Sequence, residues 1–158
     1  AKHFPGHGFV KGDTHKELIY IDGEMKEVKN YVSIIKNGVM SIMVAHLAIK
    51  NNSKFNTNGL PSTCSKKIVT DLLKDSLGFN GLIITDAMNM GGVVNVKHNG
   101  LKAAMAGCDQ LLMPVDEKEV LFDILSEMKN NDDFRKSIYE SVKKIIRIKV
   151  CLGLLSKD

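Results

Sequence analysis

Short apolar segments alternate with longer amphipathic segments along most of this sequence, and this alternation limits the possible folds more than any other feature. Residues 39–47, 81–86 and 110–114 are short and rich in aliphatic side chains, which is typical of strands buried on both faces. The segments between them carry apolar residues at helical spacing. Buried strands that alternate with helices predict an α/β fold with a parallel sheet.

The helical segments have recognisable ends. Gly38, Gly78 and Gly107 stand where three helices should stop, and glycine is the usual residue just past a helix C-terminus. Asp116 followed by Glu119 resembles a capping box at the start of a fourth. We therefore expect helices over residues 28–37, 65–77, 96–106, 116–128 and 133–152.

A first strand ending at Lys2-His3 would bring the chain to about four βα units with parallel strands. About four such units make half of a (β/α)₈ TIM-type barrel, whose full length is typically about 250 residues. A small parallel sheet can also form an open, doubly wound domain. Both folds place function at the C-terminal ends of the strands, so the polar residues there are the informative ones.

Ionisable residues gather at these predicted strand ends and in the loop after the first strand. They are Lys2, His3, His46 and Asp86 at the ends, and His7, Asp13 and His15 in the loop. The Asp86 carboxylate emerges from a buried strand, and a cation such as Lys2 would keep it ionised and able to act as a nucleophile. A strand-end Asp that caps the next turn is the alternative.

Asp13 precedes His15 by two residues in a loop that also holds Gly6, Gly8 and Gly12. A carboxylate at this spacing can accept a hydrogen bond from one imidazole nitrogen, which leaves the other nitrogen able to transfer protons. A histidine of a surface loop without such a role is the alternative. The glycines indicate a loop with unusual backbone angles that folds back over the strand ends.

Three motifs together carry a resemblance to a known family. KHFPGHGFVKGDTH (2–15), IMVAH (42–46) and GLIITDAMNM (81–90) resemble, in sequence and order, the bacterial β-N-acetylglucosaminidases of glycoside hydrolase family 3. The segment AGCDQLL (106–112) is also similar. The resemblance implies a retaining enzyme that acts on N-acetylglucosamine-containing glycosides such as peptidoglycan fragments, with no metal or cofactor.

The resemblance also implies roles for individual residues. Asp86 would form the covalent glycosyl-enzyme, and His15 would be the acid/base with Asp13 as its partner. Because a histidine replaces the second carboxyl group of most retaining glycosidases, phosphorolysis stays open beside hydrolysis.

The substrate-binding residues implied by the resemblance are Lys2, His3 and Met43, with His46 as a weaker candidate for the pocket wall. Residues 1–158 would be the C-terminal half of the barrel domain, with the N-terminal half absent. We expect such a fragment to be inactive alone and to need either the missing half or a second copy of the chain as a partner. The resemblance does not indicate the cellular compartment.

Two other readings remain. The rim offers enough ligands for a metal-dependent hydrolase. The candidate ligands are His3, His7, Asp13, His15 and His46. They lack the spacing of the usual metal-binding motifs. A carbohydrate-binding fragment without turnover is the other reading.

Composition and charge argue against nucleic acid or a membrane as a further partner. The net charge of +4 is spread along the chain, and the six Phe and three Tyr form no stacking surface for nucleic acid. No apolar stretch is long enough for a membrane span. The cysteines, Cys64, Cys108 and Cys151, fit neither a disulfide framework nor a zinc motif, so we expect buried thiols.

Overall fold

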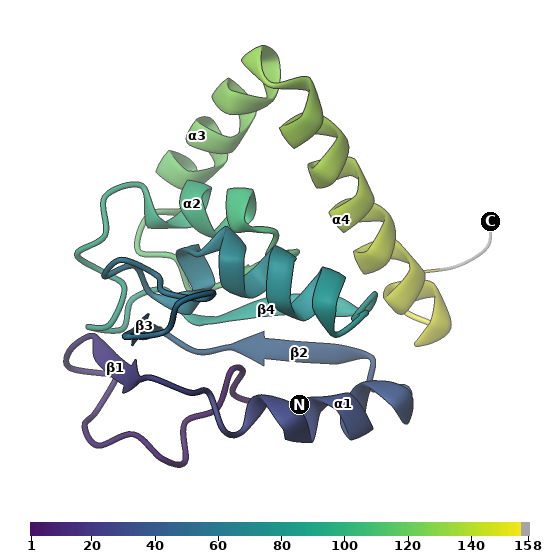
Figure 1. The fold of residues 1–158 in the computed structure, drawn as a ribbon. Helices are drawn as coiled ribbons and strands as arrows, with labels where there is room; N and C mark the ends of the chain where they lie inside the picture. The colour runs from purple at the N-terminus through teal and green to yellow at the C-terminus, as the bar shows by residue number, and fades with distance from the viewer. Residues whose placement is uncertain (156–158) are drawn as a thin grey trace.

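The computed structural model describes residues 1–155 and shows an α/β fold in which helices pack against parallel strands (Figure 1). The larger sheet contains β2 (Ser41–Val44), β4 (Leu82–Ala87) and β5 (Gln110–Leu112) in the order β2-β4-β5, and both pairings are parallel. The crossovers between these strands carry the helices. This arrangement confirms the predicted α/β class and fits half of a (β/α)₈ barrel.

The predicted first strand is present only as a short segment beside β2. Phe4 forms a parallel bridge with Val44. The Phe4 N–H donates to the Met43 carbonyl at 2.8 Å, and the Ala45 N–H donates to the Phe4 carbonyl at 2.7 Å. Residues 1–4 therefore extend the sheet on the far side of β2 from β4.

A second, smaller parallel sheet, which the sequence pattern did not predict, pairs β1 (Ile19–Asp22) with β3 (Leu47–Lys50). The predicted strand over residues 39–47 ends at Val44, and β3 begins three residues later. The break consists of Ala45 and His46 and contains no glycine, proline or other turn residue, so no local turn signal divides the two strands. The chain leaves the larger sheet at His46, whose side chain contacts residues far away in the sequence.

The predicted helices are present, with ends shifted by a few residues. The helix expected over 65–77 is wound with i to i+5 hydrogen bonds over most of its length, after a short 3₁₀ turn. Asp116 caps its helix by accepting from the Lys118 and Glu119 N–H groups, both at 2.9 Å. The helical elements are α1 (Val28–Lys36), η1 (Ser62–Cys64), η2 (Lys67–Ser76), α2 (Asn99–Ala106), α3 (Glu117–Asn130) and α4 (Asp132–Cys151).

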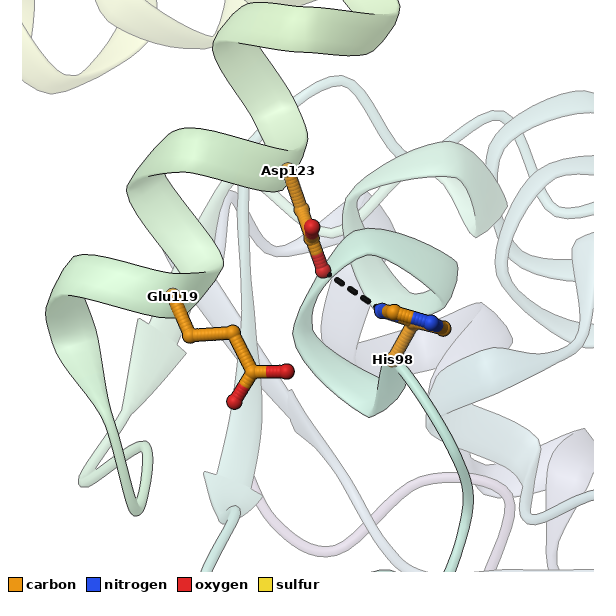
Figure 2. Close-up of side chains that lie close together, drawn as sticks. All are labelled: His98, Glu119 and Asp123. Atoms are coloured by element: carbon orange, nitrogen blue, oxygen red, sulfur yellow. Dashed lines mark hydrogen bonds and ion pairs between the residues drawn. The ribbon is translucent and has the colours of Figure 1, made fainter.

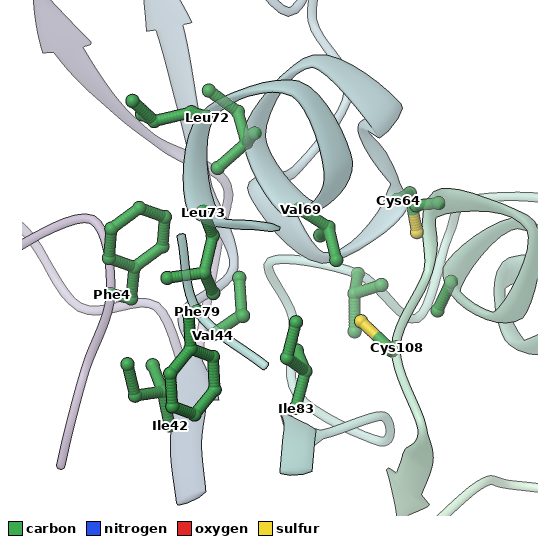
Figure 3. Packing of buried hydrophobic residues seen from close by; sticks show 14 of the residues in the cluster. Phe4, Ile42, Val44, Cys64, Val69, Leu72, Leu73, Phe79, Ile83 and Cys108 are labelled. Atoms are coloured by element: carbon green, nitrogen blue, oxygen red, sulfur yellow. The ribbon is translucent and has the colours of Figure 1, made fainter. Parts of the chain in front are cut away.

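The hydrophobic core lies between the larger sheet and the helices (Figure 3). Ile42 and Val44 of β2 and Ile83 of β4 are fully buried in it, against Val69 and Leu73 of η2. Successive side chains of a strand point to opposite faces of the sheet. The residues between these core positions therefore face the other, inner side of the sheet.

Two of the three cysteines are buried in this core, as expected. Burial raises the pKa of Cys64 to about 11, and the pKa of Cys108 is raised for the same reason. Cys151 is exposed near the end of α4, which corrects the expectation for that residue. No helix in the described part of the chain combines the length and apolar character required to cross a membrane.

Candidate active site

Asp86 lies near the end of β4, and its side chain is 19% exposed. One carboxylate oxygen, Oδ1, accepts a hydrogen bond from the Ala87 N–H at 2.9 Å. The other, Oδ2, lies 3.8 Å from His3 Nε2. Lys2, the cation expected beside Asp86, is instead an exposed residue, and the structure brings His3 to the carboxylate.

His3 is half-buried, and its burial lowers the pKa of the imidazole below the ordinary value of 6.5, against the opposing influence of Asp86. The imidazole is therefore mainly neutral at neutral pH. A neutral ring offers one hydrogen-bond donor and one acceptor. Such a side chain beside Asp86 is suited to bind hydroxyl groups.

Asp13 and His15 form the pair that their spacing predicts. Asp13 Oδ1 accepts from the His15 backbone N–H at 3.0 Å and contacts His15 Nδ1 at 2.9 Å. Because an ionised carboxylate only accepts hydrogen bonds, Nδ1 carries the proton and Nε2 is left for other chemistry. The bond from the His15 backbone, followed by that from its side chain, lowers the pKa of Asp13.

The loop that carries this pair is fixed from two sides. Inside the loop, His7 Nε2 lies 3.2 Å from the hydroxyl oxygen of Thr14, which is buried. From outside, the Gly91 N–H donates to the His15 carbonyl at 2.8 Å and the Gly92 N–H donates to the Thr14 carbonyl at 3.0 Å. The strand that ends near Asp86 thus leads directly into the segment that holds the Asp13–His15 loop.

The glycines of the loop behave partly as expected. Gly6 and Gly12 have φ angles of 133° and 124°, which non-glycine residues rarely adopt. The Gly8 N–H donates to Glu27 Oε2 at 2.8 Å, which ties the loop to the start of α1. The backbone freedom of two glycines therefore allows the loop to turn back over the strand ends.

Met43 is partly buried and lies on the inner face of the larger sheet. Its register partner in β4 is Ile84, which precedes Asp86 by one strand repeat. The structure thus places Met43 and Asp86 on the same face, with His3 beside Asp86.

His46 does not line a pocket, contrary to the weaker expectation for it. It is fully buried, with Nδ1 2.9 Å from Thr63 Oγ1 and Nε2 2.9 Å from the Ala87 carbonyl oxygen. Both ring nitrogens are thus occupied by protein groups.

The rim histidines and Asp13 do not assemble into a candidate metal site within residues 1–155. The grouping with suitable spacing in that range is His98, Glu119 and Asp123, whose potential ligand atoms lie within 4.8 Å of one another (Figure 2). His98 Nδ1 lies 2.7 Å from Asp123 Oδ2, so this pair connects the N-terminus of α2 to α3. The specific ligands of the metal-hydrolase reading are therefore not brought together.

Gly91 and Gly92 were not predicted to have a role, although their N–H groups bind the loop that holds Asp13 and His15. The signal available was the pair of adjacent glycines directly after the GLIITDAMNM motif. Glycine pairs in loops are common, so this signal alone does not identify contact partners such as His15 and Thr14, which lie 76 and 78 residues earlier in the chain.

Known proteins are similar to this chain in sequence and in fold. Residues 1–148 match the family described as the glycosyl hydrolase family 3 N terminal domain. A β-hexosaminidase of Nitrosomonas eutropha is 35% identical over 72% of this chain and 33% of its own length. A β-N-acetylglucosaminidase/β-glucosidase of Cellulomonas fimi is 29% identical over 98% of this chain and 30% of its own.

A solved structure gives the same picture. The family 3 β-N-acetylglucosaminidase of Paenibacillus sp. str. FPU-7 superposes with a TM-score of 0.84 at 26% identity, covering 94% of this chain and 30% of that one. The chain spans about a third of the length of the curated relatives it matches. Since the family match covers residues 1–148, the chain belongs to glycosyl hydrolase family 3.

Proposed function

We propose that the full-length protein is a retaining β-N-acetylglucosaminidase in which Asp86 is the nucleophile and His15 the acid/base. The observation that carries this proposal is the Asp13–His15 pair, bonded at 2.9 Å and held by backbone hydrogen bonds to the segment that follows Asp86. The similarity to β-hexosaminidases supports the choice of an N-acetylated sugar.

The residue types account for a two-step reaction with retention. In the first step, an Asp86 carboxylate oxygen bonds to the anomeric carbon while protonated His15 gives its Nε2 proton to the departing glycosidic oxygen. In the second, neutral His15 takes a proton from water, whose oxygen attacks the anomeric carbon and releases Asp86. Asp13 orients the imidazole in both steps and stabilises its charged form.

The proposed sugar site uses the residues gathered around Asp86. His3 and Lys2 would bind hydroxyl groups, and Met43 would contact the sugar from the inner face of the sheet. We propose peptidoglycan fragments, with N-acetylglucosamine linked to a muramic acid unit, as the natural substrate class.

The first test compares aryl β-N-acetylglucosaminide and aryl β-glucoside cleavage by the full-length protein. We expect the acetamido sugar to be preferred, and Asp86→Ala to lower kcat by about 10⁴-fold or more because the covalent step is lost. Asp71→Ala is the matched control, since this carboxylate pairs with Lys66 on a helix surface. Activity that survives Asp86→Ala would contradict the proposed nucleophile.

Phosphorolysis is a second candidate, favoured by the imidazole of His15 in place of a carboxylate. A carboxylate would repel an incoming anion, whereas a neutral or cationic imidazole would not. Turnover in phosphate buffer should then produce N-acetylglucosamine 1-phosphate in addition to the free sugar. If phosphate changes neither the rate nor the products, the enzyme is a hydrolase only.

A further inference from the structure

Gly91 lies against the backbone of the Asp13–His15 loop more closely than a residue with a Cβ atom could, and Gly92 beside it is packed almost as tightly. A Cβ atom added to Gly91 would lie 2.1 Å from the Lys16 carbonyl oxygen and 2.8 Å from that of His15. Distances below about 3 Å to backbone atoms require the loop itself to move. Glycine at this position is therefore required by space, and it brings the two loops into direct contact.

The contact continues from Gly92 to His46. A Cβ atom on Gly92 would lie 3.0 Å from His46 Cβ and 3.2 Å from the Thr14 carbonyl oxygen. Gly92 is therefore packed between the Asp13–His15 loop and the segment that follows β2. Even the methyl group of alanine here would require these two neighbours to give way by a few tenths of an ångström.

His46 completes the connection to the nucleophile. The Ala87 carbonyl can only accept a hydrogen bond, so the His46 Nε2–H donates to it at 2.9 Å, and Nδ1 accepts from the Thr63 hydroxyl. Ala87 follows Asp86 directly, and its N–H binds the Asp86 carboxylate at 2.9 Å. The ring thus holds the carbonyl of Ala87, the residue whose own N–H binds the proposed nucleophile.

We infer that Gly91, Gly92 and His46 are positioning residues that set the separation between His15 and Asp86. The inference rests on the proposed function, because it assigns these residues a task in that reaction. Contacts run without interruption from His15 through Gly91, Gly92 and His46 to the residue after Asp86. Since misplacing a reacting group by about 1 Å can cost about 10²-fold in rate, a fixed separation is catalytically important.

The test separates misplacement of the acid from loss of folded protein. Two N-acetylglucosaminides are compared in the full-length protein, one with a 2,4-dinitrophenyl leaving group and one with a poor phenyl leaving group. Dinitrophenolate departs without protonation, so its release needs little help from His15, whereas the phenyl substrate needs the acid. The ratio of the two kcat/KM values does not depend on how much enzyme is active.

For Gly91→Ala we expect kcat/KM to fall by about 10²-fold on the phenyl substrate and by only a few-fold on the dinitrophenyl substrate. His15→Ala should show the same pattern with a larger ratio. Gly92→Ala creates milder contacts of 3.0–3.2 Å. It is therefore the variant to measure if Gly91→Ala does not fold. His46→Gln, which keeps an amide donor, should retain a ratio nearer to wild type than His46→Ala.

Gly100→Ala is the matched control. Its added Cβ would lie 2.5 Å from a Val120 side-chain carbon between α2 and α3, so it also crowds the structure, but away from the site. It should lower the melting temperature and leave the ratio of the two substrates unchanged. Equal losses on both substrates in Gly91→Ala, Gly92→Ala and His46→Ala would overturn the positioning role. Absence of leaving-group dependence in His15→Ala would instead overturn the proposed acid/base, and the inference with it.

Discussion

The buried imidazole of His46 makes the stability of this fold depend on pH. Its imidazole is fully buried, and burial lowers its pKa below the ordinary 6.5, although the hydrogen bond to Ala87 and the charge of Asp86 act in the opposite direction. The folded chain therefore keeps the ring neutral at a pH where the unfolded chain binds a proton. Protonation and folding compete at this position.

This competition predicts a pH dependence of stability. Below about pH 6.5 the unfolded state binds more protons than the folded state, so the free energy of unfolding falls as the pH falls. The pKa of His3 is also lowered by burial, and that residue contributes with the same sign. Denaturant unfolding of His46→Gln at about pH 7.5 and about pH 5 should show a smaller difference than wild type.

Thr63→Val is the control for this prediction. It removes the hydroxyl bonded to His46 Nδ1 and should cost about 1–3 kcal/mol at either pH, but it leaves the titrating ring in place. Its pH dependence should therefore match that of wild type. The same loss of stability on acidification in wild type and His46→Gln would show that the ring does not carry the effect.

At the scale of elements, Asp109 fastens α4 to the larger sheet. Its side chain is 1% exposed and accepts from the Ile83 N–H at 2.8 Å, the Ser141 hydroxyl at 2.7 Å and Lys144 Nζ at 3.2 Å. Ile83 belongs to β4, whereas the other two donors belong to α4. One carboxylate therefore joins a strand and a helix that lie far apart in the sequence.

Removing the charged Lys144 donor should lower the free energy of unfolding, because the Asp109 carboxylate stays buried without its cation. We expect Lys144→Met to lower the free energy of unfolding by about 3 kcal/mol or more. Lys143→Met is the neighbouring control: its exposed pair with Glu140 should contribute little to stability, because solvent screens it. Urea unfolding measures both, and in the double variant Asp109→Asn with Lys144→Met part of the loss should be recovered. Similar values for the two lysines would contradict this role for Asp109.

At the scale of the molecule, α3 and α4 meet at an angle away from α1 (Figure 1), and both helices carry exposed apolar side chains. On α3, Leu121, Phe122 and Leu125 are 58%, 71% and 49% exposed. Residues 1–4 and β5 are the outer strands of the larger sheet, and outer strands can pair with other chains. Such surfaces are usually covered by another part of a protein or by a partner.

We therefore expect residues 1–158 alone to have no glycosidase activity and to self-associate. Sedimentation velocity should show species larger than the monomer, and Phe122→Ser should shift the distribution toward monomer. Phe9→Ser is the control, since Phe9 is 77% exposed but lies in the loop before Asp13. A monomeric sample that unfolds cooperatively would contradict this expectation, and sugar binding without turnover would favour the carbohydrate-binding reading.

The features that depend on neighbouring residues could be predicted from the sequence alone. Apolar spacing predicted the parallel strands and most helix ends, and the two-residue separation of Asp13 and His15 made their hydrogen bond one of two interpretations, beside a surface-loop histidine. The position of Asp86 at the end of a buried strand also followed from the pattern. Each of these depends on contacts within a few residues or on the regular repeats of strand and helix.

Contacts between segments far apart in the sequence became visible only in the folded structure. It placed His3 instead of Lys2 beside Asp86, buried His46 against Ala87, and brought Gly91 to the His15 loop. The separate β1–β3 sheet was equally unreadable from the sequence. These features join segments that are remote along the chain, and packing selects such partners by shape and available space, which no local pattern records.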